Sequence, residues 1–327
     1  MTGTSSNATP ARILLLGCNG QVGWELQRSL APLGELMALG RGGAHGHGSP
    51  ALCGDLSRPD ELARTVRELR PDVIVNAAAH TAVDKAESEH ALARTLNAEA
   101  PALLAHEAAK LGAWLVHYST DYVFDGSGSA PRDESAATAP LNVYGQTKLE
   151  GEQAIIASNC RHLIFRTSWV YGARGGNFAK TILRLATERE QLKVIDDQVG
   201  APTGADLIAD VTALCLQTLH QSGQSEADQA NGLYHLVAGG ETSWNGYARF
   251  VIEHARAAGH PIRVAPGAIE AVPTTAFPTP ARRPLNSRLD TKKLCARFGL
   301  RLPPWQRGVE RMLAELPSPA IITGAPA

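Results

Sequence analysis

The sequence predicts a doubly wound parallel α/β sheet with a smaller lobe in the second half of the chain. Short apolar runs alternate with amphipathic stretches of helical period through the first half. The apolar runs are continuous, as expected of strands that helices bury on both faces. Strand–helix alternation of this kind is typical of a parallel sheet.

The expected elements follow one another in a simple order. Strands are expected at residues 12–16, 36–39, 72–76, 114–119 and 163–170. Helices are expected at 22–30, 62–69, 87–110, 294–298 and 305–316, where apolar residues recur at helical spacing. The Gly- and His-rich segment 40–49 and residues 126–140 are expected to be loops, and the proline-rich residues 261–284 to be largely non-helical.

Composition excludes several classes of function. The 31 Lys and Arg residues against 32 Asp and Glu residues give a net charge of −1, which favours neither nucleic acid nor an anionic membrane as partner. No apolar run approaches the ~18 residues of a membrane span, and residues 1–10 lack the apolar segment of a secretory signal. The five cysteines are odd in number and form no CxxC pair, so we expect a reducing, cytoplasmic compartment.

A glycine-rich loop joins the first strand to the first helix. Gly17, Gly20 and Gly23 stand at GxxGxxG spacing. Glycine lets a ligand approach the backbone closely, and a helix N-terminus offers free N–H groups and a positive dipole end to a pyrophosphate. The context of strand, loop and helix predicts a dinucleotide-binding site.

Residues near the ends of the next strands narrow the choice of cofactor. No carboxylate for a ribose 2′-hydroxyl ends the second strand, but Arg41 is nearby, which favours NADPH and leaves NADH open. Arg41 could also be merely solvated. Asp55 follows an expected third strand and could contact adenine. Small side chains follow the strand at 72–76 and would let a flat ring lie against the sheet edge; these are Ala77, Ala78 and Ala79.

Tyr144 and Lys148 are four residues apart and would share one helix face. A free tyrosine has a pKa near 10, about 3 units above neutral pH, and a nearby ammonium narrows this gap by stabilising the phenolate. The tyrosine could then protonate a carbonyl oxygen as hydride arrives. Thr120 ends an expected strand at the sheet edge where such folds bind ligands, and its hydroxyl can bond the same oxygen. The combination predicts reduction of a carbonyl group.

These features resemble the extended short-chain dehydrogenase/reductases, in the branch that modifies nucleotide sugars. The resemblance extends over about residues 11–316. The stretches that carry it are residues 20–27, 75–87, 118–124, 140–145, 166–171, 177–180, 197–203 and 281–287.

The resemblance implies a Rossmann-type fold and NAD(P)H-dependent reduction of the 4-keto group of dTDP-4-dehydro-L-rhamnose to dTDP-L-rhamnose. It implies that Tyr144 donates the proton, that Lys148 tunes Tyr144 and holds the nicotinamide ribose, and that Thr120 polarises the ketone. The positions that match the family's cofactor site include Gly20, Gln21, Val22, Asp55, Leu56, Ala79, His80 and Thr81. Thr120, Asp121 and Trp169 match its sugar-contacting positions, and core packing is the alternative for Trp169.

Two further groups of residues could bind ligands. Arg282 and Arg283 could grip a pyrophosphate through their forked guanidinium groups, or form a structural salt bridge. Some family members dimerise around a magnesium ion, and the resemblance places its ligands here at Glu25, Asp206 and Glu315. Ordinary solvated carboxylates would explain these three residues as well.

The resemblance also implies how the chain is divided. A dinucleotide-binding domain is expected at residues 11–175 and about 205–240, and a sugar-nucleotide lobe at about 176–204 and 241–316. Residues 1–10 and 318–327 are expected to be disordered. The expected partner is a nucleotide sugar, and the protein would be a monomer or a homodimer.

Two other functions remain open. One is a 4,6-dehydratase or 4-epimerase on the same scaffold. A dehydratase of the family has Asp-Glu directly after the threonine, whereas Asp121 and Tyr122 follow Thr120 here. The other is a non-catalytic, reductase-like regulatory subunit, which should have lost the catalytic residues; this chain keeps Thr120, Tyr144 and Lys148.

Overall fold

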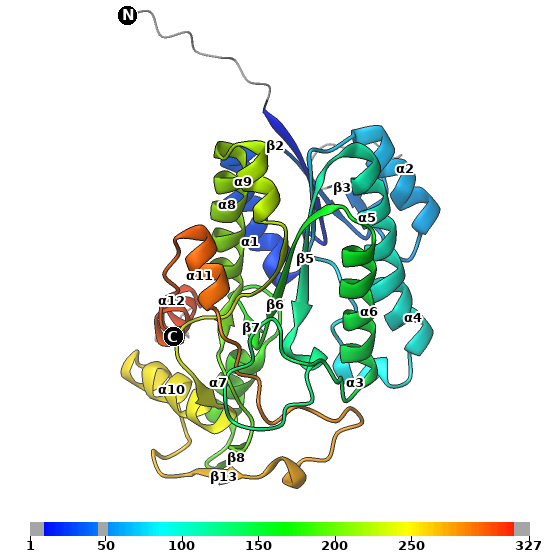
Figure 1. Ribbon diagram of the computed structural model, residues 1–327. Coiled ribbons are helices and arrows are strands. Elements are labelled where there is room, and N and C mark those ends of the chain that lie inside the picture. The colour runs from blue at the N-terminus through cyan, green and yellow to red at the C-terminus, as the bar shows by residue number, and fades with distance from the viewer. Residues whose placement is uncertain (1–9, 45–51, 317–327) are drawn as a thin grey trace, which may run out of the picture.

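The computed structural model describes residues 10–44 and 52–316. Its centre is a sheet of strand order β11-β6-β5-β4-β1-β2-β3 (Figure 1). The strands are β1 (Ala11–Leu16), β2 (Gly34–Gly40), β3 (Gly43–Ala44), β4 (Val73–Asn76), β5 (Trp114–Thr120), β6 (Arg161–Thr167) and β11 (Gly232–His235). Six strands of this sheet run parallel, and among its described strands β3 alone pairs antiparallel. The predicted parallel α/β sheet is confirmed.

Helices cover both faces of the sheet. One face carries α1 (Gln21–Leu30) and α8 (Ala205–Gln221), and the other carries α2 (Pro59–Leu69), α5 (Ala100–Leu111) and α6 (Val143–Ala157). The strand β1 shows why its apolar run is continuous: Ile13 and Leu15 pack on the α8 side, and Leu14 and Leu16 on the α5 side. A strand buried on both faces has no polar face to alternate with.

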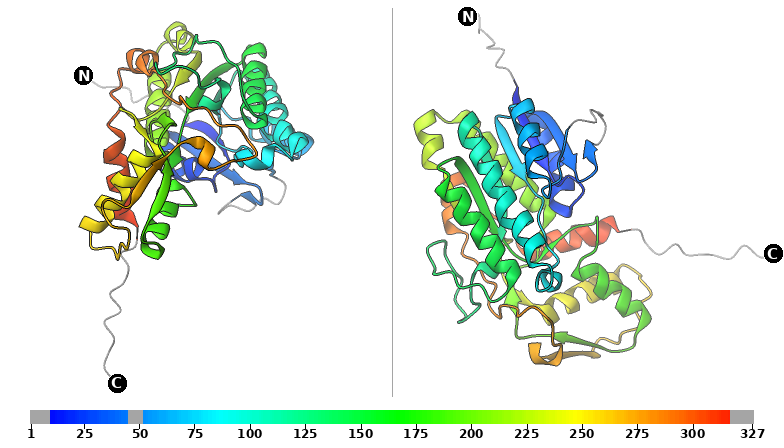
Figure 2. Two further views of the ribbon diagram at one scale, coloured as in Figure 1. Left: turned by 90° about the horizontal axis from the view of Figure 1, so that it is seen from below. Right: turned by 90° about the vertical axis from the view of Figure 1, so that its right-hand side faces the viewer.

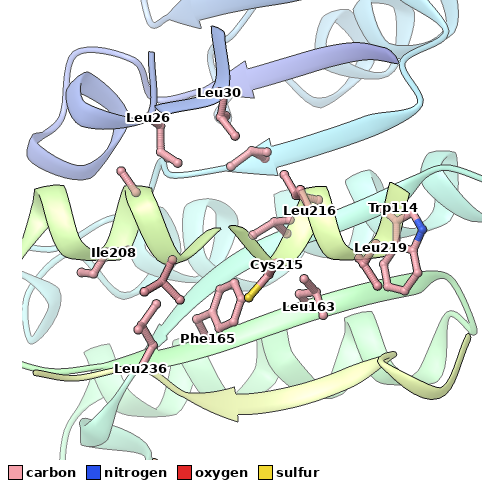
Figure 3. Close-up of a cluster of buried hydrophobic side chains, with 14 of the residues drawn as sticks. Leu26, Leu30, Trp114, Leu163, Phe165, Ile208, Cys215, Leu216, Leu219 and Leu236 are labelled. Atoms are coloured by element: carbon pink, nitrogen blue, oxygen red, sulfur yellow. The ribbon is translucent and has the colours of Figure 1, made fainter. Parts of the chain in front are cut away.

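Helix α8 joins the second half of the chain to the sheet. Figure 3 shows its side chains between α1 and the strands, with Ile208 and Leu216 beneath Leu26 and Leu30 and above Phe165 of β6. The second half of the chain therefore contributes directly to the core of the sheet.

A separate apolar cluster lies beyond the carboxyl ends of the strands. It joins α7 (Phe178–Glu188), α10 (Trp244–Ala257) and α12 (Trp305–Glu315) with the parallel pair β8 (Leu192–Ile195) and β13 (Ile269–Val272). Figure 2 shows α7, α10 and β13 side by side at this end of the molecule. Two short strand pairs lie nearby: β7 (Val170–Tyr171) with β10 (Thr203–Gly204), and β9 (Val199–Gly200) with β12 (Thr242–Ser243).

The remaining elements are short. They are η1 (Ala31–Leu33), α3 (Val83–Ala86), α4 (His90–Arg94), the π-helical η2 (Thr95–Glu99), η3 (Asp121–Val123), α9 (Gln224–Gln229), η4 (Thr274–Ala276) and α11 (Lys292–Phe298).

Three expectations from the sequence were wrong in detail. The strand expected at 163–170 ends at Thr167, because Trp169 takes a left-handed backbone conformation (φ 49°) before β7 begins. The helix expected at 87–110 is divided into α4, η2 and α5. No strand directly precedes Asp55, since Leu52 to Gly54 have no regular secondary structure.

Segment 40–49 contains β3 where a loop was expected, and its residues 45–49 lie outside the described part of the chain. The expected disordered ends also lie outside it, apart from Pro10. None of the described helices is long and apolar enough to cross a membrane. All five cysteines are free, and four of them are buried.

Candidate active site

A cavity of about 1010 Å³ opens at the carboxyl ends of β1, β4, β5 and β6. Gly17 follows β1 with φ +82°, and a Cβ there would lie 2.6 Å from the backbone nitrogen of Ala78. Gly20 caps α1 without any side-chain hydrogen bond, and the first turn of α1 holds no acidic residue. The first N–H groups of a helix lack intrahelical partners, so this turn can hold an anion without any cationic side chain.

Most of the predicted cofactor residues line this one cavity. They are Gly17, Gly20, Gln21, Val22, Arg41, Asp55, Leu56, Ala77, Ala78, Ala79, Thr81, Tyr144 and Lys148. Two lie outside it. A Cβ on Gly23 would come within 2.1 Å of the Gly17 carbonyl oxygen, so Gly23 allows α1 to pack against the loop. The His80 side chain is buried, and its Nε2 lies 2.8 Å from Glu89 Oε2.

The cavity suits a polar ligand with flat rings. Ser119 Oγ and Thr167 Oγ1 are buried, face no hydrogen-bond partner among the described residues, and belong to residues that line the cavity. The small side chains of Ala77, Ala78 and Ala79 leave room beside the sheet. These residues, with the open helix N-terminus, fit a dinucleotide.

Helix α6 carries Tyr144 and Lys148, and its first turn is firmly held. Asn142 caps it by accepting a hydrogen bond from Gly145 N (2.8 Å), and Glu87 Oε1 accepts one from Val143 N (2.8 Å). The Asn142 amide also donates to the Arg282 carbonyl oxygen (2.7 Å). The start of α6 is therefore held by its own N-cap and by contacts to two separate parts of the chain.

The structure brings Thr120, Tyr144 and Lys148 together at the cavity wall, as predicted. Burial raises the pKa of Tyr144 to about 12, and a hydrogen bond with Thr120 opposes the shift. Burial lowers the pKa of Lys148 to about 8. Desolvation is the main cause of both pKa shifts, and the stabilisation of a Tyr144 phenolate by Lys148 stays a prediction.

Three aromatic residues that were not expected from the sequence also line the cavity. Trp244 stacks on Trp169 with ring centroids 3.6 Å apart, and Phe178 packs 4.5 Å from Trp244. Tyr122 meets Tyr144 edge-on at 5.6 Å. Tyr122 directly follows the Thr-Asp pair and could have been noticed, but Trp244 and Phe178 give no local signal. All line the same cavity.

The family model for the RmlD substrate binding domain matches residues 11–318. The chain belongs to this RmlD family. It is 59% identical over 304 residues to the dTDP-4-dehydrorhamnose reductase of Shigella flexneri, covering 93% of this chain and 97% of that one. The enzyme of the same name from Salmonella typhimurium is 58% identical over the same shares of the two chains.

Solved structures agree with this RmlD assignment. The dTDP-4-dehydrorhamnose reductase of Bacillus anthracis, in complex with NADP, superposes with a TM-score of 0.80 at 33% identity, covering 94% of this chain and all of that one. The enzyme of Clostridium acetobutylicum gives the same TM-score at 34% identity, covering 92% of this chain and 98% of that one.

The predicted substrate residues of this RmlD chain are divided between the cavity and its surroundings. Thr120, Asp121, Trp169 and Arg283 line the cavity. Burial raises the pKa of Asp121 to about 7, opposed by hydrogen bonds with Ser287 and Thr120. Arg283 also forms a salt bridge with Asp84 (2.8 Å), and its contact with a pyrophosphate stays a prediction. The Arg282 side chain is exposed and does not line the cavity.

The three carboxylates predicted to bind magnesium lie near one another, away from the cavity. Arg311 approaches Asp206 (3.7 Å) and Glu315 (3.1 Å), and Arg28 approaches Glu25 (3.7 Å). Burial raises the pKa of Glu25, and Asp206 and Glu315 add to the rise. Residues 10–44 and 52–316 contain no group of three or more side chains arranged to hold a metal. The magnesium prediction gains no support.

Proposed function

We propose that this chain is an NADPH-dependent reductase that converts dTDP-4-dehydro-L-rhamnose to dTDP-L-rhamnose. One observation carries the proposal. Thr120, Tyr144 and Lys148 meet the glycine loop in a single cavity, in a chain 59% identical to a dTDP-4-dehydrorhamnose reductase along 93% of its length.

The proposed chemistry balances with the residues at hand. Bound NADPH supplies a hydride to carbon 4 of the sugar. The Tyr144 hydroxyl gives its proton to the former ketone oxygen, and Thr120 donates a hydrogen bond to that oxygen as negative charge develops on it. The ketone thereby gains one hydride and one proton and becomes an alcohol. Lys148, one turn along α6, is the nearby cation that favours the phenolate left behind.

Arg41 lines the cavity, and no carboxylate ends β2, which supports NADPH over NADH. The Bacillus anthracis relative was solved with NADP. We assign residues 11–175 and about 205–240 to the cofactor domain and about 176–204 and 241–316 to the sugar-nucleotide lobe. The aromatic residues Trp169, Phe178 and Trp244 would then face the sugar nucleotide, together with Asp121 and Arg283.

The alternatives are weaker. A dehydratase of the family would have Asp-Glu after Thr120, and Asp121 and Tyr122 stand there. A regulatory subunit would not need the buried Tyr144 and Lys148 that line the cavity. The free cysteines suit a reducing compartment such as the cytoplasm. We leave monomer and homodimer as alternatives.

The decisive experiment measures oxidation of NADPH with dTDP-4-dehydro-L-rhamnose as substrate. We expect one NADPH consumed per sugar reduced, and slower turnover with NADH. Turnover without net consumption of NADPH would instead indicate an epimerase, and no turnover at all would favour a binding subunit. A parallel assay with EDTA tests magnesium: a lower rate restored by Mg²⁺ would show a functional metal, and an unchanged rate would show that none is needed.

A further inference from the structure

A chain of buried polar side chains runs from Lys148 through His117 to Asn76, and both ends of this chain line the cavity. Lys148 Nζ is 3.0 Å from His117 Nε2 and donates a hydrogen bond to the Tyr118 carbonyl oxygen at 2.6 Å. On its other side, His117 Nδ1 is 3.2 Å from Asn76 Nδ2. Each of the three side chains is only 1% exposed. A buried histidine between a lysine and an amide needs an explanation, because apolar residues would pack here at lower cost.

The hydrogen bonds around His117 determine which of its two ring nitrogens carries the proton. The Asn76 Oδ1 accepts from Ala78 N (3.2 Å), which fixes the amide so that its nitrogen faces the ring. An amide nitrogen only donates, so His117 Nδ1 must accept, and the neutral imidazole carries its proton on Nε2. That N–H is then directed at Lys148 Nζ. An ammonium has donors only, whereas a neutral amine has a lone pair that can accept.

The charged surroundings agree with this assignment. Burial lowers the pKa of His117 well below its usual value, and Lys148 adds to the shift, so the ring stays neutral. The lowered pKa of Lys148 is opposed by Glu152, one turn further along α6. Glu152 is itself held by Arg166 of β6 through two hydrogen bonds, of 2.9 and 2.6 Å. Tyr144 lies one turn before Lys148 on the same helix.

We propose that His117, oriented by Asn76, is a positioning residue that makes Lys148 a proton donor to Tyr144. This inference rests on the proposed function. After Tyr144 has given its proton to the sugar oxygen, a proton passes from the Lys148 ammonium to the phenolate. The phenol is restored, and the neutral amine accepts the Nε2–H hydrogen bond of His117. Solvent returns a proton to the amine before the next cycle.

The sharpest test moves the proton of the imidazole from one ring nitrogen to the other with one nearly isosteric change. In Asn76→Asp, the carboxylate can accept from both Ala78 N and the ring, so the proton should move to Nδ1 and Nε2 should accept from the ammonium. Nitrogen NMR of histidine in the ligand-free protein distinguishes these two tautomers. We expect a proton on Nε2 in the parent protein and on Nδ1 in the variant.

The same change should move the pH profile. In the parent protein, kcat should fall as the pH rises above about 8, because Lys148 then loses its proton. Hydrogen bonds to charged groups are strong enough to raise that limit by about one pH unit or more in Asn76→Asp. In His117→Gln, the amide oxygen can turn toward the ammonium, so this variant should also raise the pH above which kcat falls. It is the alternative test if Asn76→Asp folds poorly.

The matched control is His162→Gln. His162 is a buried histidine on the neighbouring strand β6, and its Nδ1 lies 2.9 Å from the Cys160 carbonyl oxygen. It should leave the pH profile unchanged. A parent His117 with its proton on Nδ1 would overturn the proposal, as would variants with lower kcat at every pH but an unmoved alkaline limit. The NMR result needs no substrate, so it stands or falls separately from the reductase assay.

Discussion

Burial sets the acidity of the groups that would move protons in the cavity. It raises the pKa of Tyr144 to about 12 and that of Asp121 to about 7, and lowers that of Lys148 to about 8. A phenol this weakly acidic keeps its proton until a more basic oxygen is beside it. An alkoxide forming under hydride attack is such an oxygen. Proton donation is thereby coupled to the arrival of hydride.

Replacing Tyr144 with Phe removes the proposed proton donor and keeps the ring. We expect kcat to fall by about 10²–10⁴, the usual contribution of a positioned acid, with little change in the Kd for NADPH. Steady-state turnover and a fluorescence titration with NADPH measure the two quantities. Retained turnover would mean that another group supplies the proton.

Trp244 offers a second test, on the opposite wall. Stacked aromatic pairs contribute about 0.5–1.5 kcal/mol beyond their buried area, so Trp244→Leu should raise KM for the sugar nucleotide about two- to tenfold by releasing Trp169. Affinity for NADPH should stay the same. Trp24→Leu is the control, since Trp24 is 45% exposed and does not line the cavity. Equal effects of both changes would rule out a specific role for the stack.

The sequence could indicate that the proposed catalytic residues lie together, because their signal is local. Tyr144 and Lys148 are one helical turn apart, and Thr120 ends an apolar run. Trp244 and Phe178 could not be predicted, because they come from α10 and α7 and reach the cavity only through tertiary packing. Arg282 and Arg283 are neighbours in the sequence, yet Arg283 lines the cavity and Arg282 is exposed, a difference that the sequence alone does not reveal.

At the scale of elements, the apolar runs located the strands well, because a doubly covered strand must be apolar throughout. The ends of the strands and helices were less predictable. The strand β6 stops at Thr167 because Trp169 takes a positive φ, which an aromatic residue rarely adopts and which no composition signal announces. The π-helical η2 likewise interrupts a segment whose apolar period predicts one helix.

Helices α2 and α5 are joined by an ion pair that should make stability depend on pH. Glu107 of α5 is buried and accepts hydrogen bonds from Arg67 Nε (2.8 Å), Arg67 Nη2 (2.6 Å) and Lys110 Nζ (3.0 Å). Chiefly through Arg67, its pKa falls from 4.5 to about 2. A carboxyl whose pKa is depressed by folding stabilises the protein above pH 4.5, and this contribution is lost as the pH falls toward 2.

We therefore expect Glu107→Gln to lower the free energy of unfolding by about 2 kcal/mol at neutral pH, since the partly exposed Arg67 weakens the pair. The difference from the parent protein should shrink as the pH is lowered below 4.5. Urea unfolding at several pH values measures it. Glu188→Gln, which breaks the exposed pair with Arg184, is the control and should cost less than about 1 kcal/mol. A pH-independent loss in Glu107→Gln would point to packing and not to charge.

At the scale of the whole molecule, the net charge of −1 provides no overall attraction for anions. The proposed ligands, a dinucleotide and a sugar nucleotide, are both anionic. The means of binding them are local: the free N-terminus of α1, Lys148 and Arg283. A balanced total charge argues against polyanions such as nucleic acids, but leaves anionic small molecules as ligands.

The two apolar clusters that flank the cavity are physically continuous. Leu207 of α8 packs against both the cluster on the sheet and the cluster around α10. The cavity is lined from both sides, by Tyr144 of α6 and by Trp244 of α10. We expect a single cooperative thermal transition, since neither part can unfold without exposing apolar surface of the other.

NADPH should raise the midpoint of that transition. A ligand at about 100 times its Kd stabilises the folded state by about 2.7 kcal/mol, which corresponds to several degrees in Tm. Gly23→Ala is the matched variant: its Cβ would lie 2.1 Å from the Gly17 carbonyl oxygen, so the loop must shift and hold the pyrophosphate less well. Its Tm should respond less to the same NADPH concentration. Two separate transitions, of which NADPH moves only one, would show that the cavity joins the two parts too weakly for them to unfold together.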